Sequence, residues 1–194
     1  MMSLLKDTDI QLTLYLRHTS GLNNLKPNPA RIVEGDVLDA KKLNEAMQGQ
    51  DIVYVNLDGP LDRMAQNVLN AMKEVGTKRL IFINSLGIYD EVPGAFGKWN
   101  KRMLGQVLIT YRKAADIIES SDLEYTIIRP AWLTNDDEID YEITQKGEPF
   151  KGTEVSRKSV ADLIVKLIKG PETEIGVNLG INKPGTEGTK PSFY

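Results

Sequence analysis

The segment Arg79 to Tyr89, RLIFINSLGIY, decides the fold. Its first six residues form the most hydrophobic of the strand-length runs in the chain, and Asn84 and Ser85 bring polar groups to its end. A run that is apolar at successive positions, without strict alternation, is typical of a strand buried between two layers of helices. The segment therefore predicts a buried strand of a parallel sheet, with Ser85 at its carboxyl end.

Apolar runs of strand length alternate with segments of helical periodicity on both sides of this stretch. The other predicted strands are Ile10 to Leu16, Arg31 to Glu34, Asp51 to Asn56, Glu124 to Arg129 and Gly176 to Gly180. The apolar spacing predicts helices from Asp39 to Gly49, from about Leu61 to Gly76, from about Gly97 to Ser120 and from Ser156 onward. Residues Thr134 to Glu154 carry weak and mixed signals.

This alternation predicts an α/β fold. Helical crossovers make a sheet mostly parallel and cover both of its faces, so we expect a doubly wound sheet in three layers. The runs that begin at Ile10, Asp51, Arg79 and Glu124 are expected in that one sheet. A chain of 194 residues is long enough for one such domain and short for two. With no repeat and no internal linker, residues 1–194 are predicted to form a single domain.

Composition argues against several classes of function. The net charge is −3, whereas a general binder of nucleic acid or anionic membranes needs a basic face. No apolar run approaches the ~20 residues that span a bilayer, and Met1 to Asp7 lack the pattern of a signal peptide. The chain has no cysteine, and His18 is its one histidine, so neither thiolate chemistry nor a histidine-based metal site is expected. We expect a cytoplasmic protein without metal, nucleic acid or membrane partners.

Four short motifs carry a resemblance to a known family. They are Arg17 at the end of a predicted strand, and the segments GDVLD (35–39), NSLGIY (84–89) and YTIIRP (125–130). In order and spacing they resemble the atypical short-chain dehydrogenase/reductase superfamily, especially its small NAD(P)H-binding members. Those members are the NmrA-like proteins, the NADH-flavin reductases and the biliverdin-IXβ-reductase-like enzymes. The later segment EVSRKSVA (154–161) is similar to the helix start that follows their substrate loop. The resemblance implies an NAD(P)-binding Rossmann fold.

The chain departs from the resembled family at its amino end. In that family a strand, a glycine-rich turn and a helix precede the strand at Ile10, and the glycines let the backbone approach the pyrophosphate. Here no glycine precedes Gly21, and Met1 to Asp9 resemble the last turns of that helix. We expect the first strand and glycine loop to be absent, and such a chain to bind dinucleotides weakly or not at all. Either the natural protein lacks the segment or the sequence as given omits it. Exposed strand edges favour the second alternative.

The resemblance places the adenosine end of the cofactor near Arg17 and His18. An acidic residue at position 17 would bind the ribose 2′-hydroxyl of NAD, whereas an arginine attracts the 2′-phosphate of NADP. NADP is therefore the expected cofactor, with NAD as the alternative; an ordinary exposed loop is the other interpretation of Arg17. Asp36 and Val37 match a position that contacts adenine, although Asp36 could instead cap a turn, as Asp39 is expected to cap a helix.

Three further strand ends supply the remaining candidate cofactor contacts, because ligands of open α/β sheets bind at the carboxyl ends of strands. These contacts are Leu57, Asp58 and Gly59; Ser85 and Leu86; and Pro130, Ala131 and Trp132. Gly59 suits close approach of the cofactor, whereas Asp58 would repel a pyrophosphate unless it points away. Trp132 either stacks on the nicotinamide or a planar substrate, or packs into the wall of the fold.

Ser85 is the one candidate catalytic residue. In the extended branch of the superfamily a serine placed like this polarises the substrate carbonyl; the alternatives are a contact to the nicotinamide and a local backbone bond. The dehydrogenases of the superfamily also need a tyrosine with a lysine four residues later, which lowers the tyrosine pKa. No tyrosine here has that partner: Tyr89 is followed at this spacing by Pro93, and Tyr111 by Ala115. Ordinary alcohol dehydrogenation is therefore not expected.

The sequence thus predicts an NAD(P)H-binding protein, and first of all a reductase that transfers hydride to a flavin, a quinone or a similar planar acceptor. The reduced anion of such an acceptor collects its proton from water, so no protein acid is needed. The alternative is a non-catalytic NmrA-like dinucleotide sensor that binds a protein partner; the short chain favours the reductase. We expect a monomer or homodimer. The basic stretch from Lys98 to Lys113 is interpreted as a solvated helix face, with an anion or partner site as the alternative.

Overall fold

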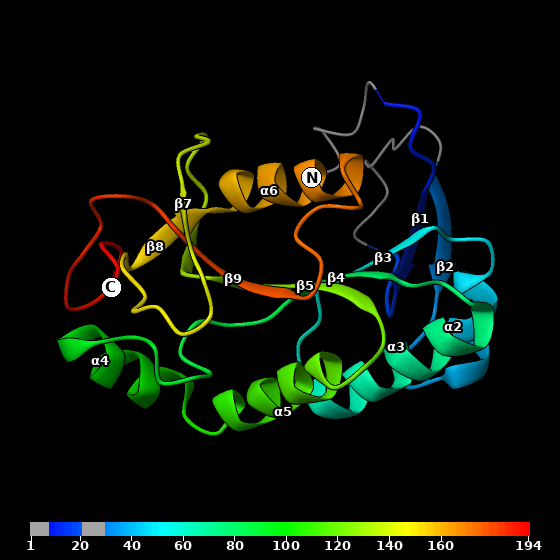
Figure 1. Cartoon of the computed structure of the whole chain (residues 1–194), viewed down its shortest axis with the longest axis horizontal. Coiled ribbons are helices and arrows are strands. Elements are labelled where there is room, and N and C mark those ends of the chain that lie inside the picture. Colours follow the sequence, from blue (N-terminus) through cyan, green and yellow to red (C-terminus); the bar gives the residue numbers. More distant parts are fainter. Residues whose placement is uncertain (1–7, 21–29) are drawn as a thin grey trace.

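The computed structural model describes residues 8–20 and 30–194, and an open sheet organises them (Figure 1). Five strands pair in the order β3-β4-β5-β9-β7. They are β3 (Ile52–Val55), β4 (Arg79–Ile83), β5 (Glu124–Pro130), β9 (Val177–Asn182) and β7 (Glu142–Thr144). The first four are parallel, and β7 runs antiparallel to β9 at one edge.

Two smaller parallel pairs complete the strands of the described residues. β1 (Leu12–Leu16) pairs with β2 (Ala30–Glu34), and β6 (Trp132–Thr134) pairs with β8 (Glu154–Ser156). The expectation that residues 10–16 share one sheet with the other three runs is therefore wrong. In the described part of the chain β1 pairs with β2 alone, because a cleft lies between β1 and β3 where a further strand would have to pair with both.

Helices cover both faces of the five-stranded sheet (Figure 1). One face carries α6 (Arg157–Lys169), and the other carries α2 (Ala40–Met47), α3 (Leu61–Val75) and α5 (Val107–Glu119). A further helix, α4 (Gly94–Leu104), precedes α5. These layers confirm the predicted three-layer α/β fold with a mostly parallel sheet. Among the helices of residues 8–20 and 30–194, none combines the length and the apolar content needed to cross a membrane.

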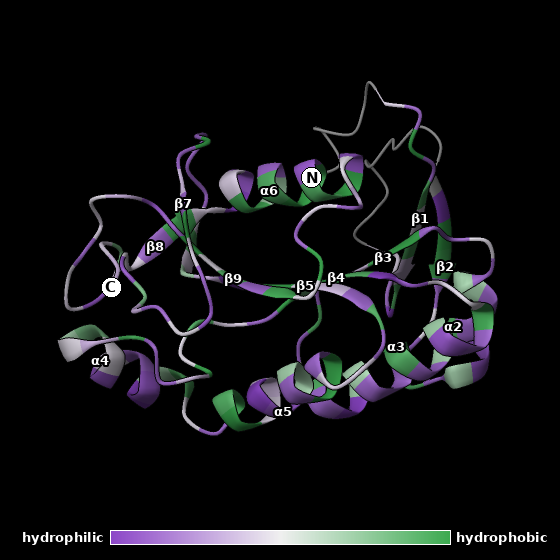
Figure 2. Ribbon diagram, in the orientation of Figure 1, coloured by the Kyte–Doolittle hydropathy of each residue, from purple (hydrophilic) through white to green (hydrophobic). Residues whose placement is uncertain are grey.

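Strand β4 serves both helical layers. Its side chains alternate between the two faces of the sheet, as in any strand. Leu80 and Phe82 pack with α3 and α5, whereas Ile81 packs with α6, and all three are fully buried. Figure 2 shows that α6 turns its hydrophobic residues toward the sheet. Burial on both faces is the reason that residues 79–84 form a continuous apolar run.

Three predicted helix ends are confirmed. The Asp39 carboxylate accepts a hydrogen bond from the Lys42 N–H at 3.2 Å, ahead of α2. The Ser156 hydroxyl accepts one from the Ser159 N–H at 2.9 Å, ahead of α6. Gly76 ends α3 with a φ of 82°, the left-handed conformation that glycine adopts without strain.

Other boundaries differ from the expectation. The long helix predicted from residue 97 to 120 is two helices, because Gly105 adopts a φ of 51° and ends α4 before Val107 starts α5. The weakly patterned residues 134–154 contain β7 and the start of β8, each only three residues long. The predicted helix end at residues 1–9 falls almost wholly on residues outside the described ranges.

A cleft of about 760 Å³ separates β1 from β3. Residues 9–16 line one side of it and residues 49–57 line the other, while Val68 of α3 and Ile168 of α6 reach it from the two helical layers. Within the described ranges no strand pairs with the edges of β1 and β3 that face this cleft. The parallel sheet is therefore interrupted at this point.

Close packing around Gly180 in β9 gives the first testable prediction. A Cβ atom at this position would lie 2.3 Å from Thr144 Oγ1 and 2.8 Å from the Phe150 ring. We expect Gly180→Ala to lower the free energy of unfolding by about 1–3 kcal/mol through overpacking. In urea denaturation the midpoint should fall without a change in slope. Gly170→Ala is the control, since its Cβ would meet no atom closer than 3.5 Å. Equal midpoints for the two variants would contradict this account.

Candidate functional site

The candidate residues follow the carboxyl ends of parallel strands. The crossovers through α2 and α3 return the chain to the same edge each time, so the ends of β2, β3 and β4 lie along one rim. Along this rim the predicted contacts are Arg17 and His18 after β1, Asp36 and Val37 after β2, Leu57, Asp58 and Gly59 after β3, Ser85 and Leu86 after β4, and Pro130, Ala131 and Trp132 at the end of β5.

The loop after β1 is tied to the end of β2. Thr19 donates hydrogen bonds from its hydroxyl and its backbone N–H to the Glu34 carboxylate, at 2.6 and 3.3 Å. These bonds hold the pKa of Glu34 below its usual value. Arg17 and His18 lie exposed on the same loop. The sequence analysis did not predict this contact of Glu34. The position of Glu34 at the end of a predicted strand, directly before Gly35, could have marked it as a candidate residue.

Asp36 and Val37 form a rigid turn. The Tyr15 hydroxyl donates to the Asp36 carbonyl oxygen at 2.8 Å, and the Asp36 carboxylate accepts from the Leu38 N–H at 2.8 Å. Asn67 of α3 donates to the Val37 carbonyl oxygen at 3.0 Å, and the Val37 side chain is buried. Asp36 therefore has the turn-capping role that the sequence left open, while contact of either residue with adenine stays a prediction.

The carboxylate of Asp58 is engaged by α5. It accepts a hydrogen bond from the Tyr111 hydroxyl at 3.3 Å. Burial raises the pKa of Tyr111 to about 12, and the charge of Asp58 adds to this rise. Gly59 follows with a φ of 125°, a conformation available to glycine and strained for other residues. After β3 the rim therefore has the Asp58 carboxylate, bonded to Tyr111, followed by Gly59, which has no side chain.

Ser85 is positioned by its neighbour. The buried Asn84 donates to the Tyr111 carbonyl oxygen at 3.0 Å and accepts from the Ser85 N–H at 2.8 Å, so it joins the end of β4 to α5. The Ser85 hydroxyl donates to the Leu86 carbonyl oxygen at 3.1 Å, one of the alternatives that the sequence left open. Sequence reasoning missed the role of Asn84. Three neighbouring candidates have buried side chains: Leu86, Pro130 and Ala131.

A buried ion pair holds the loop after β4. The Arg129 guanidinium is fully buried in β5 and pairs with the Glu91 carboxylate. Glu91 also accepts hydrogen bonds from the backbone N–H groups of Gly87 and Tyr89, both at 2.9 Å. The Arg129 Nε donates to Asn178 of β9 at 2.7 Å. One carboxylate therefore neutralises the sheet arginine and shapes the loop that follows Ser85.

Tyr89 is locked into a charged cage. Its hydroxyl donates to the Glu119 carboxylate at 2.9 Å and accepts from the Asn178 side-chain amide at 2.8 Å. Lys146 and Arg112 lie 4.5 and 4.6 Å from the centre of its ring. Burial first, and the bond to Glu119 second, raise the pKa of Tyr89 well above its usual value. A tyrosine held in this way keeps its proton at neutral pH.

Trp132 belongs to an aromatic cluster. Its ring centre lies 4.9 Å from that of Trp99 and 5.1 Å from that of Tyr194. The indole N–H donates to the Asn100 side-chain oxygen at 2.9 Å. Packing into the wall of the fold, the second interpretation of this residue, is thus present in the structure; stacking on a nicotinamide or a substrate stays a prediction.

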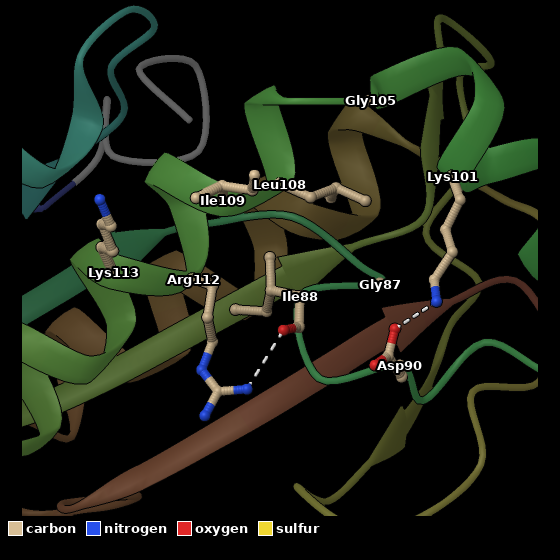
Figure 3. A pocket seen from close by; sticks show the side chains of 9 residues that line it. All are labelled: Gly87, Ile88, Asp90, Lys101, Gly105, Leu108, Ile109, Arg112 and Lys113. Atoms are coloured by element: carbon tan, nitrogen blue, oxygen red, sulfur yellow. Dashed lines mark hydrogen bonds and ion pairs between the residues drawn. The ribbon is translucent and has the colours of Figure 1, made fainter.

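A pocket of about 410 Å³ borders the β4–α4 loop (Figure 3). Gly87, Ile88 and Asp90 of the loop face side chains of α4 and α5 across it. Two of the basic residues noted in the sequence line it in ion pairs, Lys101 with Asp90 at 2.6 Å and Arg112 with Asp116 at 2.8 Å. Partial neutralisation of this kind is typical of a solvated face. Within residues 8–20 and 30–194 no cluster of three or more His, Asp or Glu side chains is placed to hold a metal ion.

Comparisons with known proteins show the family and the fold. A family model described as NAD(P)H-binding matches residues 1–171. A Rossmann-fold NAD(P)-binding family protein from Shigella flexneri is 50% identical, with a TM-score of 0.85 over 100% of this chain and 91% of that one. A short-chain dehydrogenase/reductase from Veillonella parvula, solved with NADP, is 28% identical, with a TM-score of 0.90 over 98% of this chain and 91% of that one. An anaerobillin reductase from Escherichia coli O157:H7 shares the fold, at 21% identity and a TM-score of 0.79 over 96% of this chain and 91% of that one.

The Arg129–Glu91 pair gives a prediction about stability. Glu91→Gln keeps the shape of the side chain but leaves the buried Arg129 charge uncompensated. We expect a loss of about 3 kcal/mol in the free energy of unfolding, measured by urea denaturation. Asp122→Asn is the control, because the pair of Asp122 with Lys78 is exposed and its loss should leave the midpoint unchanged. A Glu91→Gln protein as stable as the control would show that the pair does not hold the loop.

Proposed function

Because the chain belongs to the NAD(P)H-binding family, we propose that it is an NAD(P)H-dependent oxidoreductase whose hydride acceptor is a flavin, a quinone or a similar planar molecule. The family match over residues 1–171 supports the dinucleotide. The Veillonella parvula short-chain dehydrogenase/reductase, 28% identical and solved with NADP, supports the same cofactor class in a related chain. The acceptor is inferred from the side chains of the rim.

We assign the two ends of the dinucleotide to two parts of the rim. The exposed guanidinium of Arg17 would meet the 2′-phosphate of adenosine, with His18, Asp36 and Val37 around the adenosine. Gly59, without a side chain, would allow the cofactor to pass the end of β3. The nicotinamide would then lie at Ser85 and the end of β5. The hydrogen bond of Asp58 to Tyr111 supports an Asp58 carboxylate that faces α5, the case in which the sequence allows a pyrophosphate nearby.

The state of the two tyrosines near this rim carries the proposal. Tyr111 bonds to Asp58 and has a pKa of about 12, and Tyr89 bonds to Glu119 with its pKa raised further. A catalytic tyrosine needs the opposite shift, toward neutral pH. Neither residue is thus suited to give a proton to an alkoxide. The bound dinucleotide supplies hydride, and an acceptor whose reduced form takes its proton from water needs no such donor.

The chain's own contribution is then orientation. Asn84 and Glu91 hold the backbone on either side of Ser85, so this segment is fixed before a ligand arrives. The Ser85 hydroxyl, bonded to the neighbouring carbonyl oxygen, can turn to the carboxamide of a nicotinamide without a change in the backbone. Fixed geometry of this kind favours hydride transfer, which depends steeply on the alignment of donor and acceptor.

Cofactor preference tests the role of Arg17. The titrations and the turnover assays below use the protein with a strand and glycine loop ahead of Ile10, because binding without them is expected to be weak. In that protein we expect NADPH to bind more tightly than NADH, and Arg17→Ala to weaken NADPH about tenfold or more, because a charged contact to phosphate contributes ~1.5–3 kcal/mol. Binding of NADH should change little. Titrations followed by the fluorescence of the reduced nicotinamide measure both affinities. Arg31→Ala, an exposed arginine within β2, is the matched control.

Two other outcomes are informative in the same titrations. Equal losses for both dinucleotides, or no loss, would remove Arg17 from the site. A preference for NADH that disappears in Glu34→Gln would instead assign Glu34 to the ribose hydroxyl, since a carboxylate at the end of this strand suits NAD.

Turnover tests the absence of a protein acid. We expect NADPH oxidation with free flavin or a simple quinone to survive Tyr89→Phe and Tyr111→Phe without a large loss, apart from any loss of folded protein. Ser85→Ala should cost a modest factor, because it removes a positioning contact and no proton donor. Initial rates of NADPH absorbance loss, with folded fraction checked by circular dichroism, provide the measurement.

A loss of several orders of magnitude in either folded tyrosine variant would show that a proton-donating tyrosine exists. Tight dinucleotide binding without turnover on any acceptor would favour the other candidate, a non-catalytic sensor that binds a protein partner. The hydrogen-bonded state of Tyr89 and Tyr111 is also compatible with a sensor. Turnover is therefore the observation that distinguishes a reductase from a sensor.

A further inference from the structure

The pocket between the β4–α4 loop and the helices α4 and α5 has walls that the oxidoreductase proposal does not use (Figure 3). Its volume of about 410 Å³ lies in the range of small-molecule sites. The apolar part of the wall is aliphatic, with Ile88 from the loop and Leu108 and Ile109 from α5. Ile109 is 48% exposed, and an apolar ligand would remove part of this surface from water. The pocket therefore suits a ligand with an aliphatic body.

A buried amide lies next to this pocket without a partner for its N–H groups. Asn100 of α4 is 1% exposed, and its Oδ1 accepts the Trp132 indole N–H at 2.9 Å. An indole N–H can only donate, so this bond fixes the orientation of the Asn100 amide. Its Nδ2 has no hydrogen-bond partner among the described residues. A buried donor that lacks an acceptor is unfavourable, so an acceptor atom at this point would stabilise the structure.

The space in front of the amide belongs to the pocket. A Cβ atom built on Gly87 would lie 2.6 Å from Asn100 Nδ2 and 3.9 Å from Leu108 Cδ1. The space beside Nδ2 is therefore bordered by Gly87 and Leu108, and both residues line the pocket. Gly87 has a φ of 87° and no side chain, so it leaves this space free. The Asn100 amide thus provides a hydrogen-bond donor at the inner end of the pocket.

The charge of the lining is positive. Lys101, Arg112 and Lys113 line the pocket together with one carboxylate, that of Asp90. Asp90 pairs with Lys101 at 2.6 Å, and Arg112 pairs with Asp116 at 2.8 Å. These pairs account for two of the cations as parts of a solvated face. Lys113 is exposed and forms no ion pair with a described residue. The excess of positive charge favours an anionic ligand over a neutral one.

We propose that this pocket binds a small aliphatic carboxylate. The aliphatic chain packs against Leu108 and Ile109, and the carboxylate accepts a hydrogen bond from Asn100 Nδ2 in the positive field of the lining. Lys101 follows Asn100 directly in α4 and supplies the cation nearest to it in sequence. The proposal goes beyond the oxidoreductase function, because this pocket holds neither the dinucleotide nor the hydride acceptor in that proposal.

The probe is octanoate, titrated by calorimetry into the protein used for the titrations above, without dinucleotide. We expect saturable binding at a single site. Acetate carries the carboxylate without the chain and should bind at least about tenfold more weakly. Octanol carries the chain without the charge and should bind at least about threefold more weakly, because a hydrogen bond to a charged group is stronger than one to a neutral group.

Asn100→Asp tests the amide donor. The new side chain keeps an oxygen for the Trp132 indole N–H but replaces the Nδ2 donor by a second oxygen, which repels a carboxylate. We expect octanoate to bind about tenfold or more weakly, in protein whose folded fraction is checked by circular dichroism. The indole N–H signal of Trp132 in a nitrogen-15 spectrum gives a second readout, since this group bonds to Asn100. Octanoate should shift this signal in the unchanged protein and not in the variant.

Two matched pairs of exposed positions test the pocket without a change in the core. Ile109→Asn should weaken octanoate about fivefold through lost apolar contact. Val107→Asn is its control on the same helix, 45% exposed and outside the lining. Lys101→Gln should weaken octanoate about threefold or more, because it removes a cation and leaves Asp90 unpaired. Lys98→Gln is its control, an exposed lysine of α4 outside the lining. Both controls should bind octanoate unchanged.

Several results would overturn the proposal. No saturable binding of octanoate would do so, and so would equal binding of octanol, which would show an apolar surface without anion recognition. Equal binding of acetate would show attraction of any anion to a basic face. Equal affinities within both matched pairs would place the ligand elsewhere, and this comparison decides the question even if Asn100→Asp does not fold. Failure of NADPH binding or turnover bears on the oxidoreductase proposal alone.

Discussion

The conformation of the loop after β4 depends on one buried charge, the Arg129 guanidinium, which needs an acidic partner because it has no access to water. Arg129 lies fully buried in β5, and the removal of such a charge from water costs several kcal/mol unless a partner compensates it. Glu91 can be that partner only if residues 85–91 fold back over the sheet edge. Its carboxylate then also takes the N–H groups of Gly87 and Tyr89. The shape of the candidate nicotinamide site is thus a consequence of charge burial in the sheet.

The same burial decides what Tyr89 can do. Asn178 bridges Arg129 and the Tyr89 hydroxyl, and Glu119 accepts a hydrogen bond from that hydroxyl. The sequence places Tyr89 four residues after Ser85, a spacing that resembles a catalytic pair. In the fold, the Tyr89 hydroxyl belongs to the network of Glu119 and Asn178, whereas the Ser85 hydroxyl bonds the adjacent Leu86 carbonyl oxygen. Partial burial and the hydrogen bond to Glu119 both raise the pKa of this hydroxyl, the opposite of the shift that a catalytic tyrosine needs.

Much of the fold could be predicted because local chemistry and tertiary placement agree. The apolar run at residues 79–84, the caps Asp39 and Ser156, and the glycine end of α3 all depend on neighbours close in sequence. Three features could not be predicted. β7 is short and lies at a sheet edge. Nothing in the sequence distinguishes Gly105, which ends a helix, from a glycine inside a helix. The partners of Glu34, Asn84 and Glu91 come from elsewhere in the fold. The position of the candidate residues along one rim follows from the strand order. The hydrogen bonds that each of their side chains forms depend on partners distant in sequence.

The interruption between β1 and β3 links these points. Arg17 stands on the β1–β2 pair, whereas Ser85 stands on the five-stranded sheet, and no described strand joins the two. What connects them is the packing of α2 against α3, with side-chain hydrogen bonds from Asn67 to the Val37 carbonyl oxygen, from Asn44 to Glu74 and from Thr77 to the Gln50 carbonyl oxygen. Side-chain packing and a few side-chain hydrogen bonds resist displacement less than a continuous ladder of backbone bonds. A dinucleotide that reached from Arg17 to Ser85 would need these two parts at a fixed separation, and the packing of α2 against α3 is what sets that separation in the described part of the chain.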